Sequence, residues 1–263
     1  MSLAFAAVTP HPPVLIPNIG KEAAAKLEQT KNSLLKLEEE LYLSRPHAII
    51  IISPHSSLFP DAFSVNAHTQ FVSNFAEFGD ITTQKTWKGY PDLAARLGHG
   101  GNTKAIALRL VSEERVDYGV SVPLFFLANH LPDIKVLPIG YSHLDPKEHL
   151  AFGELLKECI MDTDKRIALI ASGDLSHTLT KDSPAGYHPS GEKFDAAMIE
   201  LLQARNTVGV ASLDETLVAQ AEQCGYRSIL ILLGVLKNMD FSFKTYSYEA
   251  PFGVGYLAGN FVF

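Results

Sequence analysis

Several histidines in this sequence stand just beyond apolar runs that predict buried strands. His55 follows Ile49–Ile52, and His11 follows the run 3–8, with a proline immediately before each histidine. Proline cannot donate a ladder hydrogen bond, so it turns the chain out of the sheet and presents the next residue at the strand's carboxyl end. Open α/β sheets hold their ligands at that edge. The repetition of this arrangement predicts a site built from histidines.

Two further histidines have a similar setting. His177 closes the segment that follows the apolar run 166–172, and His143 follows the run 134–139. Asp174, three residues before His177, either orients the His177 ring or caps a turn. His143 matches no ligand position, and we interpret it as a supporting or core residue.

A carboxylate completes a possible metal site. Glu249 lies at the turn between two strand-like segments near the end of the chain. Two imidazoles and one carboxylate form the ligand set of non-haem iron(II) oxygenases, which leaves positions open for substrate and dioxygen. His11, His55 and Glu249 are the candidate ligands, and His177 would then be free to move protons. Because only a fold can gather such scattered residues, structural histidines or a hydrolytic zinc site remain alternatives.

The elements that must position these residues predict an α/β fold, with a central, mostly parallel or mixed sheet flanked by helices. A charged, leucine-rich stretch at 21–43 has the spacing of an amphipathic helix that connects the first two strands. Further helices are expected at 91–111 with a break at Gly98–Gly101, from near Pro123, and at 145–161, 192–204, 213–222 and 226–237. Edge strands are expected within 61–86, and a hairpin-like pair at 241–248 and 254–263.

The totals favour one domain over residues 1–263. The chain is 46% hydrophobic and contains no linker-like, low-complexity or repeated segment. Its formal net charge of −7 argues against nucleic acid or an anionic membrane as a partner.

The two cysteines, Cys159 and Cys224, have no metal-binding or redox spacing and are expected to be buried structural residues in a reducing compartment. The N-terminus lacks the pattern of a signal peptide, and no apolar segment is long enough to span a bilayer. We therefore expect a cytoplasmic protein.

Four motifs in register carry a family resemblance. They are Thr9-Pro-His-Pro-Pro13, Ser53-Pro-His55, Ser172-Gly-Asp-Leu-Ser-His177 and Tyr248-Glu-Ala-Pro-Phe-Gly253. In this order, and over nearly the whole chain, the sequence resembles the class III extradiol ring-cleaving dioxygenases. It is most similar to the catalytic B subunit (LigB) type within the Memo-like superfamily.

The resemblance implies a metal, a substrate class and roles for particular residues. The metal would be Fe(II), with His11, His55 and Glu249 as ligands and His177 as the catalytic acid and base. The substrate would be an aromatic small molecule, a catechol or a 2-aminophenol, whose ring is opened with O2. Two neutral imidazoles and one carboxylate leave the ferrous ion one net positive charge, which a monoanionic catecholate neutralises.

The sequence departs from the family at one catalytic position. Tyr118 stands where many relatives carry the histidine of Asp-His-Gly, so a neutral hydroxyl donor replaces a group that can be charged. The two-subunit relatives also cover their site with a small α subunit, so either a second chain or a homo-oligomer is expected to do so. His188, in the loop 178–191, either contacts substrate or caps the next helix.

Three functional hypotheses follow. The leading one is an iron(II)-dependent extradiol dioxygenase. The second is a Memo-like metal-binding protein of different activity, such as the B component of the AMMECR1–Memo–radical-SAM system. The third is a non-catalytic protein-binding module that keeps a decayed metal pocket.

Overall fold

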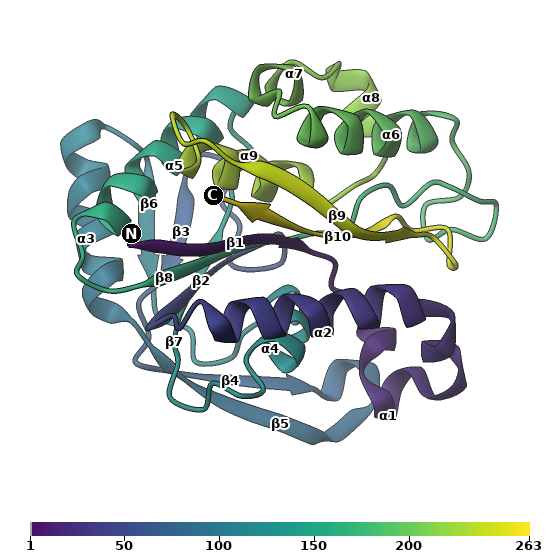
Figure 1. The fold of residues 1–263 in the computed structure, drawn as a ribbon, viewed down its shortest axis with the longest axis horizontal. Coiled ribbons are helices and arrows are strands. Elements are labelled where there is room, and N and C mark those ends of the chain that lie inside the picture. Colours follow the sequence, from purple (N-terminus) through teal and green to yellow (C-terminus); the bar gives the residue numbers. More distant parts are fainter. Residues whose placement is uncertain (1) are drawn as a thin grey trace.

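The protein is built around one mixed sheet of ten strands, seen in a computed structural model that describes residues 2–263 (Figure 1). Eight strands lie in the order β4-β5-β7-β2-β8-β1-β10-β9, and β3 pairs with both β7 and β6. The strands are β1 (Leu3–Thr9), β2 (Ala48–Ser53), β3 (Phe63–Asn66), β4 (Gln70–Phe75), β5 (Asp80–Gly89), β6 (Leu108–Val111), β7 (Lys135–Gly140), β8 (Ile167–Ser172), β9 (Ser242–Glu249) and β10 (Tyr256–Val262).

The centre of the sheet is parallel and covered on both faces. β7, β2, β8 and β1 all run in the same direction, and β10 then returns antiparallel beside β1. The β2 isoleucines show why the sequence does not alternate: Ile49 and Ile51 enter one core, and Ile50 and Ile52 enter the other. The predicted α/β architecture with a central mixed sheet is confirmed.

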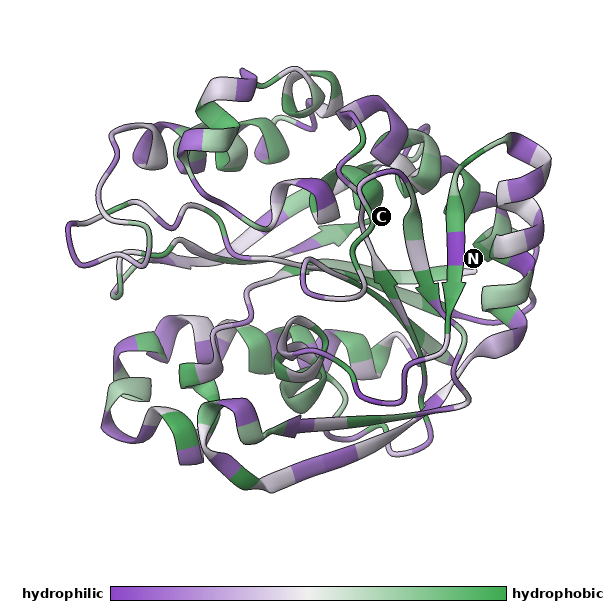
Figure 2. Ribbon diagram, turned by 180° about the vertical axis from the view of Figure 1, so that it is seen from behind, coloured by the Kyte–Doolittle hydropathy of each residue, from purple (hydrophilic) through white to green (hydrophobic). Residues whose placement is uncertain are grey.

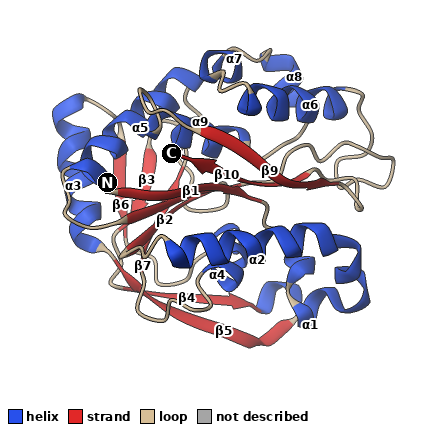
Figure 3. Cartoon of the chain, in the orientation of Figure 1, coloured by secondary structure: helices blue, strands red, loops and turns tan. Residues whose placement is uncertain are grey.

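Helices cover the two faces of the sheet unequally. α2 and α4 pack on one face, and α3, α5, α6 and α9 pack on the other (Figure 3). The helices are α1 (Pro17–Gly20), α2 (Glu28–Leu43), α3 (Pro91–Lys104), α4 (Tyr118–Leu127), α5 (Pro146–Met161), α6 (Ser190–Gln203), α7 (Thr207–Ala211), α8 (Glu215–Gln220) and α9 (Tyr226–Val235), with short 3-10 turns η1 (Pro13–Leu15), η2 (Lys21–Leu27) and η3 (Ala76–Phe78). Figure 2 shows hydrophobic residues concentrated along the central strands. Within residues 2–263, no helix combines the length and apolar character needed to cross a bilayer.

The predicted helix break at Gly98–Gly101 is wrong, because α3 runs through these glycines without interruption. A Cβ atom on Gly100 would lie 2.7 Å from Leu155 Cδ1 of α5. The glycine therefore permits close helix packing rather than a turn. The end of the predicted helix is also wrong, since the chain there forms strand β6.

Helix α4 begins five residues before the predicted start at Pro123. Asp117 caps it, accepting a hydrogen bond from the Val120 amide at 3.1 Å. Pro123 consequently lies inside the helix, where it supplies no amide proton to the helical ladder. Tyr118, in the first turn, is placed at the end of the helix that faces the carboxyl edge of the sheet.

We expect Ile51→Ala to lower the free energy of unfolding by about 2–5 kcal/mol, because it removes three carbons from a side chain with no exposed surface and leaves a cavity. Ile81→Ala is the matched control: Ile81 is 83% exposed, so its truncation should change stability by less than about 0.5 kcal/mol. Urea unfolding followed by circular dichroism measures both. Equal effects of the two substitutions would contradict the assignment of β2 to the core.

Candidate metal centre

The carboxyl ends of the central strands bring the predicted histidines together. β1 and β8 end level with each other, since Thr9 pairs with Ser172, and β2 ends one residue beyond its Ile52–Ala171 pair. His11 and His55 follow β1 and β2 directly, each after one proline. The predicted position of these histidines at one edge of the sheet agrees with this register.

The two imidazoles face each other at close range. His11 Nε2 lies 3.2 Å from His55 Nε2, and the two rings meet edge-on with centroids 5.0 Å apart. Cys224, in the loop between α8 and α9, places its Sγ 3.6 Å from His11 Nε2. One ligand atom from each of these three residues lies within 4.8 Å of the other two.

The two distances from His11 Nε2 match those between donors that share one metal ion. Tetrahedral bonds of about 2.0–2.1 Å to nitrogen and 2.3 Å to sulfur put two nitrogens roughly 3.3 Å apart and a nitrogen and a sulfur roughly 3.6 Å apart. Two imidazoles and a thiol are ligands that suit zinc, iron or copper. The residues present therefore fit a transition metal.

A second group of potential ligands adjoins the first. Asp174, His177 and Cys224 also place one ligand atom each within 4.8 Å of the others, so the Cys224 sulfur belongs to both groups. Asp174 Oδ1 accepts a hydrogen bond from the His11 amide at 2.9 Å, and the Asp174 amide donates to Cys224 Sγ at 3.2 Å. Asp174 thus holds the backbone of His11. His177 lies beside the site, where the sequence placed the proton-transfer group.

Glu249 is not brought to the two histidines. Its Oε1 accepts hydrogen bonds from the Thr30 amide at 2.7 Å and the Thr30 hydroxyl at 2.6 Å. Thr30 lies in the first turn of α2, where Leu27 at the N-cap provides no side-chain cap. The helix leaves these amides unsatisfied, and its positive end attracts an anion. Glu249 thus belongs to neither group of potential ligands, and Cys224 is the third residue grouped with His11 and His55.

Cys224 was interpreted from sequence as a structural cysteine. It is buried as expected, but its sulfur lies against His11. The one local signal is its place in Gln223-Cys224-Gly225, between two helices, and a turn of this kind does not by itself indicate a ligand. The pairing joins residues 213 positions apart, which no local pattern reports.

Tyr118 lies against both imidazoles. Its ring stacks on His55 with centroids 4.2 Å apart and an interplanar angle of 26°, and it meets His11 edge-on at 5.4 Å. Burial, with additional effects of Cys224 and Asp174, raises the pKa of Tyr118 far above its usual value. The group therefore stays a neutral hydroxyl that can donate a hydrogen bond beside the metal centre.

Of the two roles considered for His188, substrate contact and helix capping, its hydrogen bond agrees with capping. It is half-buried, and its Nδ1 accepts a hydrogen bond from the Ser190 amide, at the start of α6, at 3.2 Å. It belongs to neither ligand group.

Burial sets the charge state of the centre. It lowers the pKa of His11 to about 3 and that of His55 to about 4, because the charged imidazolium loses its hydration. It also raises the pKa of Asp174 to about 6. Both imidazoles are thus neutral near pH 7, which is the form that coordinates metals.

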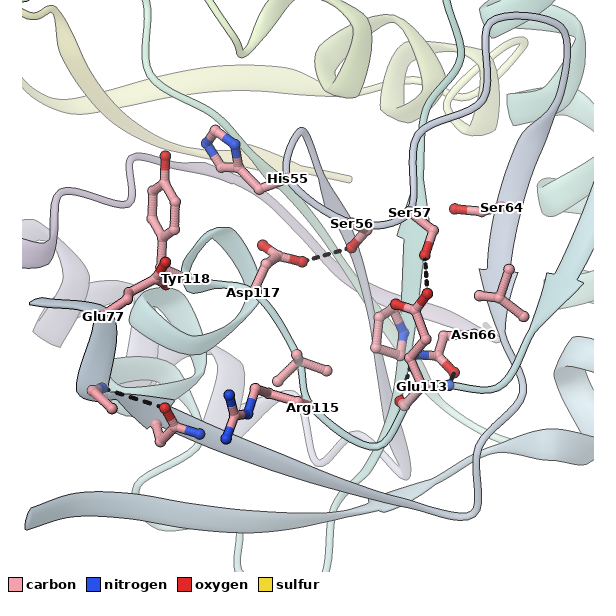
Figure 4. A pocket seen from close by; sticks show the side chains of 15 residues that line it. His55, Ser56, Ser57, Ser64, Asn66, Glu77, Glu113, Arg115, Asp117 and Tyr118 are labelled. Carbon is pink, nitrogen blue, oxygen red and sulfur yellow. Dashed lines mark hydrogen bonds between the residues drawn. The ribbon is translucent and has the colours of Figure 1, made fainter. Parts of the chain in front are cut away.

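A polar cavity of about 360 Å³ opens beside His55 and Tyr118 (Figure 4). On its wall Asp117 accepts hydrogen bonds from Ser53 Oγ at 2.6 Å and Ser56 Oγ at 2.8 Å, which fixes the His55 turn against α4. The lining residues are His55, Ser56, Ser57, Ser64, Asn66, Asn74, Ala76, Glu77, Val111, Glu113, Arg115, Val116, Asp117, Tyr118 and Pro138. The volume suits a small molecule in contact with His55.

Comparison with known proteins gives consistent matches. The family model of the catalytic LigB subunit of aromatic ring-opening dioxygenase matches residues 5–259. Protein CA_C1420 of Clostridium acetobutylicum is 32% identical over 97% of this chain, which spans 57% of that longer protein. A MEMO1 family protein of Methanosarcina mazei is 22% identical over 81% of this chain and 82% of its own length.

Among solved structures, the crystal structure of uncharacterized protein JW3007 from Escherichia coli K12 shares the fold, with a TM-score of 0.69. The match covers 98% of this chain and 99% of the Escherichia coli chain, at 21% sequence identity.

We expect Glu249→Ala to lower the free energy of unfolding by about 1 kcal/mol, because the first turn of α2 loses the carboxylate that accepts from the Thr30 amide and hydroxyl. Metal affinity, measured by titration with a divalent ion, should stay within about threefold of the unsubstituted protein. Glu39→Ala, at an exposed position of the same helix, is the control and should change neither quantity. A loss of metal binding in Glu249→Ala would return Glu249 to the ligand set.

Proposed function

Because the chain belongs to the family of catalytic LigB subunits of aromatic ring-opening dioxygenases, we propose that it is an iron(II)-dependent extradiol dioxygenase acting on a catechol- or 2-aminophenol-type ring. The observation that carries the proposal is the convergence of His11, His55 and Cys224, of which His55 also lines a cavity. These three residues would hold the ion. Ferrous iron, when bound, would supply a centre that brings the deprotonated substrate and dioxygen together.

Exchange of a carboxylate for a thiolate preserves the charge balance of the site. Two neutral imidazoles and one thiolate, like two imidazoles and one carboxylate, leave a divalent ion with one net positive charge. A monoanionic catecholate neutralises that charge in either case. The absence of Glu249 from the centre is therefore compatible with the proposed substrate class.

The surrounding residues have roles that the geometry supports. His177, beside Asp174 and Cys224, would accept the proton of a substrate hydroxyl and return it to the product. The Tyr118 ring packs on His55 and lines the cavity, so its hydroxyl would hydrogen-bond a polar atom of the substrate. Arg115 brings a positive charge to the cavity lining, and it would contact an electron-rich or anionic part of the substrate.

A second candidate is a Memo-like metal-binding protein that does not open aromatic rings. Two observations favour it: the thiol in the ligand group and the similarity to a MEMO1 family protein. A soft sulfur donor also suits zinc or copper(I), neither of which supports the proposed ring opening as ferrous iron would.

Oxygen uptake after anaerobic loading with iron(II) separates the two candidates. With catechol or 2-aminophenol as substrate, the dioxygenase should consume one O2 per ring and form a coloured ring-opened product. Tight iron binding without oxygen uptake on either ring would favour the second candidate. A protein that binds no divalent ion would overturn both.

We expect His177→Ala to slow ring opening by about 10²- to 10⁴-fold while iron still binds, because only proton transfer is removed. Cys224→Ala should instead weaken iron binding, measured by metal content after gel filtration. His188→Ala is the matched histidine control and should retain the rate, since its ring contacts the Ser190 amide away from both ligand groups. A His177→Ala variant of undiminished rate would refute the assigned role.

A further inference from the structure

We propose that Ser172 is a positioning residue, which fixes the His11 ring in the tautomer that directs its Nε2 lone pair to the metal. The inference rests on the proposed metal-binding function. It is carried by two hydrogen bonds of Ser172, at the end of β8: one joins it to His11, two residues after β1, and the other to Gly119 in the first turn of α4. Ser172 has no exposed surface, so no bulk water competes for its hydroxyl.

The proton of Ser172 can go to only one place. A serine hydroxyl has one proton to donate and lone pairs to accept. Ser172 Oγ lies 2.6 Å from the carbonyl oxygen of Gly119, which can only accept. It also lies 2.9 Å from His11 Nδ1. With its proton given to Gly119, the Ser172 oxygen must accept from His11, so Nδ1 carries the imidazole proton.

The Gly119 carbonyl is available because of Pro123. In an α-helix a carbonyl accepts from the amide four residues later. Four residues after Gly119 stands Pro123, which has no amide proton. The buried carbonyl therefore lacks its usual helical donor, and the Ser172 hydroxyl takes that place. Because Pro123 donates no hydrogen bond to the Gly119 carbonyl, this oxygen can accept from Ser172, which in turn contacts His11.

The tautomer set by Ser172 is the one that the site needs. With the proton on Nδ1, His11 presents a bare Nε2 to His55 Nε2 at 3.2 Å and to Cys224 Sγ at 3.6 Å. The opposite tautomer would place an N–H among the metal donors. In the metal-free protein His55 must then carry its proton on Nε2 and donate it to His11.

His55 is positioned by other means. Within residues 2–263 its Nδ1 makes no hydrogen bond, and the ring is held by stacking on Tyr118 and by the bond from its amide to Ser53 Oγ at 3.2 Å. Loss of the Ser172 hydroxyl removes a direct contact of His11 and none of His55, so the tautomer preference should change at His11 and not at His55. This separates the inference from a general loosening of the site.

Cobalt(II) titration under anaerobic conditions, in competition with a chelator, tests the inference. Ser172→Ala should weaken cobalt binding about 10- to 100-fold, as removal of hydrogen-bond partners of metal ligands does elsewhere. Ser172→Thr, which keeps the hydroxyl, should recover most of that affinity. Ser228→Ala is the matched control, because Ser228 is equally buried and its hydroxyl has no hydrogen-bond partner among residues 2–263. Equal affinity of Ser172→Ala and the unsubstituted protein would overturn the proposal.

The His11 tautomer can be read without any metal. Long-range ¹H–¹⁵N NMR of the metal-free protein should show His11 protonated at Nδ1 and His55 at Nε2, and Ser172→Ala should lose the preference at His11. A His11 ring protonated at Nε2 in the unsubstituted protein would refute the inference. If the unsubstituted protein binds no cobalt, the proposed function fails, and the NMR result still decides the role of Ser172.

Discussion

Two uncharged imidazole nitrogens held 3.2 Å apart are the contact on which the organisation of this site depends. Such a contact is unfavourable unless a proton or a metal lies between the lone pairs, so the rings must be held by their surroundings. The parallel pairing of β1 with β8 fixes one ring, and the first turn of α4 reaches both. Asp117 ties down the His55 turn through two serines, while Gly119 connects to His11 through a third.

Close packing at Gly119 makes this arrangement possible. A Cβ atom there would lie 2.4 Å from Ser53 Oγ and 3.3 Å from His55 Cδ2. The helix end can approach the β2 turn only because residue 119 lacks a side chain. Each residue of Asp117-Tyr118-Gly119 therefore has its own contact at the site. Asp117 accepts from Ser53 and Ser56, the Tyr118 ring stacks on His55, and the Gly119 carbonyl accepts from Ser172.

Local patterns in the sequence predict the strands and the edge where they end, because buried strands and the prolines after them are local signals. Thus β1, β2 and β8, and the closeness of His11 and His55, follow from the sequence, whereas the hydrogen bond of Asp174 to the His11 amide does not. The bounds of α3 and α4 do not follow from the sequence, because Gly100 permits close packing of α3 against α5 and Pro123 is accommodated inside α4. The positions of Cys224 and Glu249 depend on contacts more than 200 residues apart in sequence, which periodicity and turn chemistry do not report.

The hydrogen bonds of Glu249 to α2 indicate the order in which tertiary contacts form while the chain is synthesised. Thr30 leaves the ribosome 219 residues before the carboxylate that satisfies its amide, and His11 leaves 213 residues before the sulfur that meets it. Contacts of such long separation form late, since the intervening chain must first be closed into a loop. A nascent chain therefore carries an unfinished set of donors until Cys224 has emerged, and the first turn of α2 lacks its acceptor until β9, which ends at Glu249, has followed.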